Sequence, residues 1–98
     1  MVKVSFYNKK VILKGHAMHG DYGQDIVCSA ISSISQYTAE FLKKEKLGSY
    51  KKKNGYLKIE YSNDELSLKI IEHMKEAMIS IEKDYPGNVK VEVKNKWN

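Results

Sequence analysis

The chain has 98 residues, 42% of them hydrophobic and 30% charged, which is typical of one globular domain and excludes a disordered chain. We therefore expect residues 1–98 to form a single domain. The net charge is +5, yet all 17 basic residues are lysines. Arginine supplies the bidentate contacts that read bases, so we expect no specific nucleic-acid readout. No apolar run resembles a membrane span or secretory signal, so we expect no membrane partner and a cytoplasmic location.

The sequence contains one cysteine, Cys28. A single thiol excludes an intrachain disulfide and a multi-cysteine zinc cluster. We expect neither a cofactor nor a metal.

The first half of the chain changes from a two-residue to a helical period. Residues 2–7 alternate between apolar and polar and predict a strand, and residues 11–14 predict a second strand that forms a hairpin with it. Residues 15–24 contain three glycines and predict a loop. A helix is then predicted from Asp25, as its N-cap, to near Leu47, with Gly48 just past its end.

The second half predicts one or two strands, a helix and a strand. Asn54-Gly55 is a hairpin-turn signal before a strand at 56–61. A helix is predicted to start at 62–65 and to stop before Pro86-Gly87. Residues 89–93 alternate between apolar and charged and predict the final strand. The fold class is therefore α+β, a two-layer sandwich of a mainly antiparallel sheet with two helices on one face. Strand parity places Tyr7, Ile12, Tyr56 and Trp97 on the outer sheet face, where a homodimer could bury some of them.

Cys28 is the N3 residue of the first helix if Asp25 is the N-cap. The free amides and the dipole of a first turn stabilise a thiolate, and neighbouring amides can stabilise an oxyanion. A cysteine nucleophile needs a base, and His16, at the end of the second strand, is better placed than His19 in the loop or His73 on the second helix. By pattern alone, a small buried cysteine and a simple loop histidine remain the more common alternatives.

Two short blocks carry a family resemblance. They are Gly15-His16-Ala17 and residues 23–32, which read Gly-Gln-Asp-Ile-Val-Cys-Ser-Ala-Ile-Ser. They resemble the signature of the ribosomal-processing cysteine protease family, Prp, in which Gly-His-Ala and a short glycine-containing loop precede Gly-x-Asp-Ile-Val-Cys-Ala-Ala-x-Ser. Ser29 departs from the usual alanine. The resemblance extends to chain length and element order.

The resemblance implies a cysteine endopeptidase that acts as a homodimer. In this family the substrate is the short N-terminal extension of a large-subunit ribosomal protein, the twenty-seventh of its series, which is removed during ribosome assembly. It implies that Cys28 is the nucleophile and His16 the general acid/base. In this family the extension is apolar and aromatic near the cleaved bond, so the resemblance also implies an apolar groove beside the loop.

Supporting roles are expected for four further residues. Asp25 would cap the helix that holds Cys28 and could also contact His16. Gly15 would let the strand turn sharply before His16, and Gly20 and Gly23 would give the loop its freedom, because glycine tolerates backbone angles that other residues avoid.

Two other functions are compatible with the sequence. A small basic α+β domain with exposed aromatic residues could be a noncatalytic RNA- or ribosome-binding module, although no recognised RNA-binding motif is present. A metal site could be formed by His16, His19, Asp21 and Cys28, although their spacing matches no standard zinc pattern.

Overall fold

The computed structural model describes residues 1–15 and 22–94, and for residues 22–25 it describes the backbone only. The elements follow the order strand, strand, helix, strand, strand, helix, strand, as the sequence predicts. Their bounds are β1 Val2–Tyr7, β2 Lys10–Lys14, α1 Tyr22–Lys44, β3 Gly48–Lys53, β4 Tyr56–Tyr61, α2 Glu65–Asp84 and β5 Val89–Val93.

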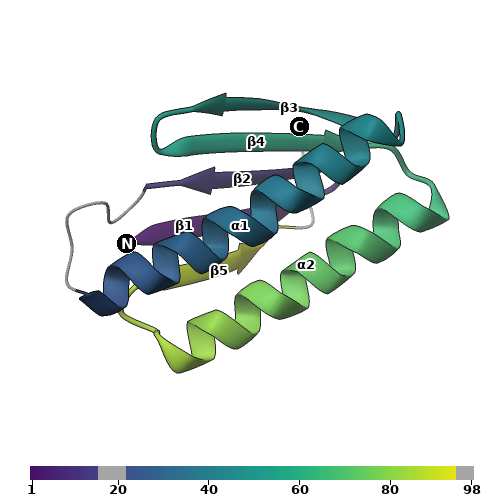
Figure 1. Ribbon diagram of the computed structural model, residues 1–98. Helices are drawn as coiled ribbons and strands as arrows, with labels where there is room; N and C mark the ends of the chain where they lie inside the picture. The colour runs from purple at the N-terminus through teal and green to yellow at the C-terminus, as the bar shows by residue number, and fades with distance from the viewer. Residues whose placement is uncertain (16–21, 95–98) are drawn as a thin grey trace.

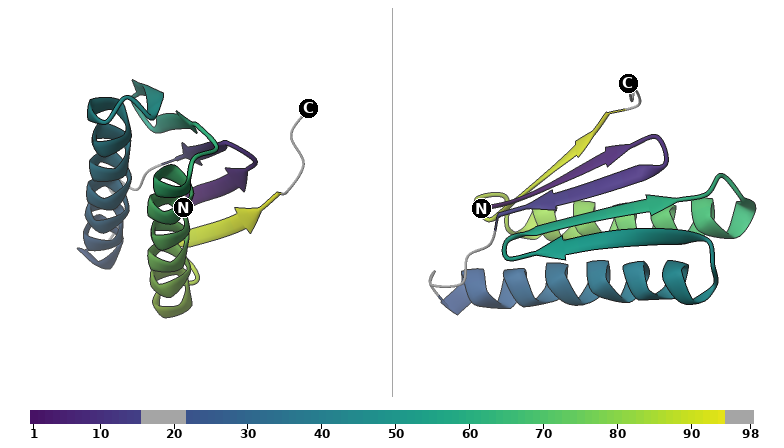
Figure 2. Two further views of the ribbon diagram at one scale, coloured as in Figure 1. Left: turned by 90° about the vertical axis from the view of Figure 1, so that its right-hand side faces the viewer. Right: turned by 90° about the horizontal axis from the view of Figure 1, so that it is seen from above.

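The five strands form one sheet in the order β3-β4-β2-β1-β5. Every neighbouring pair is antiparallel except β1 and β5, which are parallel. Both helices lie on the same face of this sheet, and the opposite face is left uncovered by them (Figures 1 and 2). The predicted α+β two-layer architecture is therefore confirmed.

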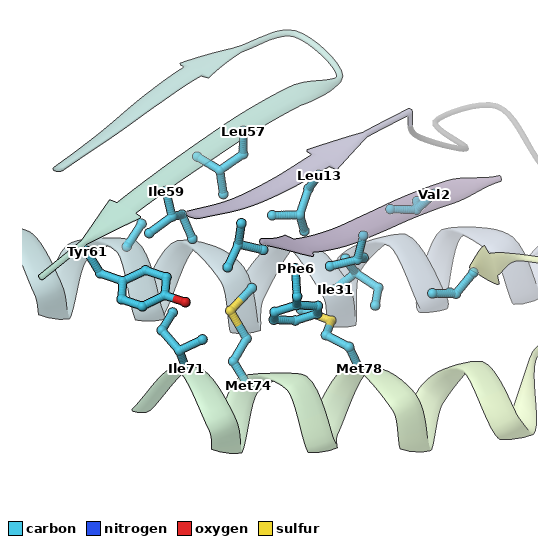
Figure 3. Close-up of a cluster of buried hydrophobic side chains, with 14 of the residues drawn as sticks. Val2, Phe6, Leu13, Ile31, Leu57, Ile59, Tyr61, Ile71, Met74 and Met78 are labelled. Carbon is cyan, nitrogen blue, oxygen red and sulfur yellow. The ribbon is translucent and has the colours of Figure 1, made fainter. Parts of the chain in front are cut away.

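The core lies between the sheet and the two helices (Figure 3). Alternate strand residues point into it, since successive side chains of a strand face opposite ways. Met74 and Met78 of α2 and Ile31 of α1 meet these strand residues from the helical layer. The buried strand residues are Val2, Val4, Phe6, Val11, Leu13, Leu57, Ile59, Tyr61 and Val89.

Helix α1 begins at Tyr22, so the prediction that Asp25 is its N-cap is wrong. The apolar stripe starts only at Ile26, and the pattern therefore placed the helix start beside it. A helix that is anchored on the core by Val27 and Ile31 can extend beyond its stripe, because each added residue gains a backbone hydrogen bond. Asp25 lies within the first helical turns.

The other end of α1 also differs from the prediction. The helix ends at Lys44, and Lys46, not a glycine, takes the left-handed conformation that closes it, at φ 61°. Leu47 N–H donates to the Leu42 carbonyl at 2.8 Å and Lys46 N–H to the Lys43 carbonyl at 3.1 Å, the two bonds of a Schellman motif. Gly48 instead opens β3, where an added Cβ would lie 2.3 Å from the Glu60 carbonyl oxygen.

Helix α2 starts where the sequence predicts. Asp64 is its N-cap, and the Asp64 carboxylate accepts a hydrogen bond from the Ser67 N–H at 3.1 Å. The helix ends at Asp84, just before Pro86-Gly87. Within the part of the chain that the structure describes, neither helix has the length and apolar character needed to cross a membrane.

Candidate active site

A groove of about 840 Å³ runs between the first half of α1 and the β3–β4 hairpin. Its lining includes Val2 at the start of β1 and Gly15 just after β2, and Figure 1 shows the start of β1, the end of β2 and the start of α1 at the same end of the molecule. Its apolar wall is made by Val2, Leu13, Ile31 and Leu57. Hydroxyl, amide and ammonium groups complete the lining, which has no carboxylate among the described residues and includes Ser29, Ser32, Ser33, Ser35, Gln36, Lys52, Lys53, Asn54 and Tyr56.

Cys28 lines this groove and is partly exposed to it. Its side chain also packs against the edge of the hydrophobic core. Because α1 begins at Tyr22, Cys28 lies six residues further on, about 9 Å along the helix axis. The prediction that Cys28 is the N3 residue is therefore wrong, and the dipole and oxyanion arguments, which hold for a first turn, do not apply to it.

Gly15 fixes the end of β2 in the lining of the groove. Its φ is +88°, and an added Cβ would lie 2.5 Å from the Met1 carbonyl oxygen, so only glycine fits here. The Gly15 N–H donates to the Gly55 carbonyl at 2.9 Å, which ties the strand end to the β3–β4 turn. Gly15 and Cys28 thus line one groove, although 12 residues separate them along the chain.

Several predicted residues lie outside the described residues. His16, the residue after Gly15, is one of them, as are His19, Gly20 and Asp21. Gly23 lies in the first turn of α1, and the Asp25 side chain is not described. The contact between His16 and Cys28 thus remains a prediction.

The third histidine is separate from the groove. His73 is exposed on α2 and is not among the groove residues. Among residues 1–15 and 22–94, no three side chains of the metal-binding types gather into a possible metal site. The four-residue metal site considered from the sequence includes three undescribed residues and stays untested.

A polar bridge crosses the groove and was missed by the sequence reasoning. The Lys52 ammonium donates to the Gln36 side-chain carbonyl at 2.9 Å, and the Gln36 amide donates to the Ser32 hydroxyl at 2.6 Å. The spacing of Ser32 and Gln36 is visible in the sequence as neighbours on a helix. Lys52 comes from β3, and only tertiary packing brings it there.

Comparisons with known proteins converge on one family. The model of the family described as "Cysteine protease Prp" matches residues 1–90. Ribosomal processing cysteine protease Prp from two Staphylococcus aureus strains, Mu50 and NCTC 8325, is 34% identical to this chain over 91 residues, which cover 86% of this chain and 85% of that protein.

Solved structures agree in fold. The essential ribosomal processing protease Prp from S. aureus with a covalently linked product peptide has 25% identity and a TM-score of 0.80, covering 96% of this chain and all of that one. The same protease with a substrate peptide gives a TM-score of 0.85 at 23% identity and the same coverage. A Streptococcus mutans protein gives 0.78 at 24% identity, covering 97% of this chain and 93% of that one. With a family model that spans most of its length, the chain belongs to the cysteine protease Prp family.

Proposed function

We propose that this protein is a cysteine endopeptidase that removes the short N-terminal extension of a large-subunit ribosomal protein. The observation that carries the proposal is that the one thiol of the chain lines a groove with an apolar wall. Such a groove suits an extended peptide with apolar side chains near the scissile bond. The S. aureus relative is a ribosomal processing protease, which supports the same substrate class here.

Cys28 is the proposed nucleophile and His16 the proposed general acid/base. His16 accepts the thiol proton, and the Cys28 sulfur attacks the scissile carbonyl carbon. Collapse of the tetrahedral intermediate breaks the C–N bond, His16 protonates the leaving amine, and a thioester remains. Water then hydrolyses the thioester and frees Cys28. The covalently linked product peptide of the S. aureus relative supports a covalent route.

The position of Gly15 supports the pairing of these two residues. Gly15 lines the groove and is tied to Gly55 by a backbone hydrogen bond, and His16 follows it directly in the chain. Six residues, 16–21, then separate Gly15 from the start of α1, the helix that carries Cys28. Asp25 and Gly23 are proposed to support the site from within α1, where the structure places Gly23 in the first turn and not in the predicted loop, and Gly20 from the connection that leads into the helix.

Two further properties are proposed on the family resemblance. The protein is expected to work in the cytoplasm, where its substrate is made, and to act as a homodimer. The lysine-rich outer face of the sheet, described below, makes that face a poor centre for the dimer contact.

The test is a trimming assay on a ribosomal protein that carries its extension, with the product length read by mass spectrometry. Cys28→Ala and His16→Ala are each expected to lower trimming by at least about a hundredfold, since each removes a group that the chemical step needs. Trimming by Cys28→Ala at the wild-type rate would refute the mechanism.

Ser29→Ala is the matched control. Ser29 is exposed in α1, lies next to Cys28, and replaces the alanine that is usual in the family signature. We expect this variant to trim at close to the wild-type rate. Thermal melting of all three variants shows whether a loss of trimming reflects chemistry or unfolding.

A further inference from the structure

The outer face of the sheet is covered by neither helix (Figure 2). Because Val2, Val4 and Phe6 point into the core, the intervening residues of β1 point outward, and the register carries this parity across the sheet. Strands β2 and β3 then contribute Lys10, Lys14, Lys51 and Lys53. The other strands contribute Lys3, Lys58 and Lys90, and Lys94 joins them just beyond β5, over the ring of outward-facing Tyr7. We call this surface the lysine face.

The lysine face holds more than the net charge of the chain. Among the residues whose side chains the structure describes, it carries eight of 16 lysines, one of them the buried Lys10, and two of ten acidic residues, Glu60 and Glu92, which gives +6. The other eight described lysines and eight described acidic residues sum to zero. The net positive charge of the described residues is therefore concentrated on one side of the sheet.

One line of cross-strand neighbours contains no acidic residue. Lys90 is the partner of Lys3, Lys3 of Lys14, Lys14 of Tyr56, and Tyr56 of Lys53. We call this line, which crosses all five strands, the lysine row; at the usual strand spacing it spans about 19 Å. Like charges directly opposite one another destabilise a sheet, so this arrangement breaks a rule of sheet stability. Such violations are expected at functional surfaces.

Both acidic groups of the face are already neighbours of lysines. The Glu92 carboxylate lies 3.4 Å from the Lys94 ammonium and 3.7 Å from the Lys3 ammonium. The Glu60 carboxylate lies 3.9 Å from the Lys58 ammonium. None of these ion pairs involves Lys14, Lys53 or Lys90, which are exposed. Three of the four lysines of the row thus lie outside these ion pairs and offer their ammonium groups to an anionic partner.

A second copy of the chain fits this face poorly. A two-fold contact would set the same +6 surface against itself, whereas interface cores are depleted in lysine. A membrane is also a poor fit, because none of the exposed large apolar side chains among the described residues comes from an outward-facing position of a strand. A polyanion with regularly spaced phosphates satisfies the charge without needing apolar contact.

We propose that the lysine face docks the phosphate backbone of RNA without reading its sequence. The inference does not depend on the roles of Cys28 and His16. Tyr56, half-buried within the row, adds a ring on which a base can stack. Two row residues, Lys53 and Tyr56, also line the groove, so docked RNA would lie next to the peptide site. A protease that docks on RNA in this way would be held beside ribosomal proteins that are already assembled on it.

The test measures binding of a fluorescein-labelled 20-nucleotide RNA by anisotropy from 50 to 200 mM KCl. The variant Lys14→Gln/Lys51→Gln/Lys90→Gln removes three exposed lysines of the face. We expect about tenfold weaker binding and a log–log salt slope shallower by about 2, since each phosphate contact on a single strand contributes about 0.7. A scrambled RNA of equal length is expected to bind equally well.

The matched control is Lys44→Gln/Lys69→Gln/Lys83→Gln, three exposed lysines of the helices with the same change in net charge. It should stay within about twofold of wild type, as should Cys28→Ala, and both triple variants are checked by thermal melting. Equal loss in the two triple variants would mean a diffuse charge effect and overturn the proposal. So would a dimer that dissociates in the face variant while RNA binding is unchanged, or binding to anionic vesicles but not to RNA.

Discussion

At the scale of single residues, the position of Cys28 changes where its reactivity must come from. The thiol is in the second turn of α1, and the effect of a helix terminus fades within the first turn. The backbone amides around Cys28 are also bonded within the helix and cannot serve as oxyanion donors. In the proposed mechanism the thiol is therefore activated by a side-chain base, His16, and not by the helix terminus.

Asp64 is the described residue with the most strongly shifted acidity. Hydrogen bonds from the Ser62 and Ser67 hydroxyls, with the Ser67 backbone amide, lower the pKa of the Asp64 carboxyl from 3.8 to about 2. The ionised Asp64 carboxylate accepts these hydrogen bonds, and they hold the start of α2 in place. A carboxyl whose pKa is lower in the folded state stabilises the fold above its unfolded pKa and loses that contribution as the pH falls toward its folded pKa.

We therefore expect the contribution of Asp64 to be full above pH 4 and to disappear between about pH 4 and pH 2. Asp64→Asn keeps a capping oxygen but does not titrate. Urea unfolding of both proteins over this range measures the difference in their free energies of unfolding, which should be constant above pH 4 and shrink below it. A difference that is flat down to pH 2.5 would contradict the role assigned to this carboxylate.

At the scale of elements, the junction between α1 and β3 contains an avoidable strain. Lys46 is held at φ 61°, a conformation that costs most residues other than glycine roughly 1 kcal/mol or more. Its side chain is exposed, and its backbone carries a hydrogen bond of the motif that closes the helix. Nothing in the described packing requires a lysine side chain at this position.

Lys46→Gly is expected to stabilise the protein by about 1 kcal/mol, because glycine adopts the left-handed conformation without steric cost. Chemical denaturation gives the value. Lys69→Gly, at an exposed position inside α2, is the opposite control and should destabilise by about 1 kcal/mol. Destabilisation by both substitutions would mean that the lysine at position 46 is preferred for a reason outside its backbone conformation.

The elements were predictable where one face is buried and the pattern is periodic. Val2, Val4 and Phe6 mark β1, and the apolar residues of α2 mark its buried stripe. The start of α1 was not predictable, because Tyr22-Gly23-Gln24 carry no apolar repeat. The end of α1 misled the prediction because a lysine takes the place that glycine usually holds, and Gly48 has another role.

The residues of the candidate site could be predicted from local sequence blocks, but the contacts between distant segments could not. The signature blocks point to Cys28 and His16, and Gly15 fits its expected role as a turn. The groove wall combines α1 with the β3–β4 hairpin, and no local pattern in Lys52 or Gln36 indicates that they meet. In the same way, strand parity predicts which lysines lie on the outer face of the sheet. That Lys3 lies opposite both Lys90 and Lys14 depends on the order of the strands in the sheet, which the crossover connections determine.

At the scale of the whole molecule, the charge distribution sets a balance between stability and proposed binding. Opposed lysines lie on neighbouring strands of the lysine face, and like charges directly opposite one another destabilise a sheet. The penalty is electrostatic and exposed, so mobile ions screen it. Salt that weakens RNA binding should therefore strengthen the fold.

Raising KCl from 10 to 500 mM is expected to raise the melting temperature of the wild-type protein by a few degrees, because the screening length shrinks from about 30 Å to less than 8 Å. The Lys14→Gln/Lys51→Gln/Lys90→Gln variant should have a higher melting temperature than wild type at 10 mM KCl, and its melting temperature should rise less as the salt is increased. Calorimetry of both proteins and of the helix-lysine control measures this. The same gain in all three proteins would show that the repulsion is not centred on this face.

The pairing of β1 with β5 has a consequence for how the chain is made. These are the first and last strands, and Ser5 and Glu92 face one another across 87 positions of sequence. Contacts of such long sequence separation form slowly and only when both segments are present. Val89 supplies part of the core from β5, so a chain in which residues 89–93 have not yet been synthesised cannot complete its sheet. We therefore expect the groove next to Val2 to take its final form only after β5 has emerged from the ribosome, which delays activity until that point.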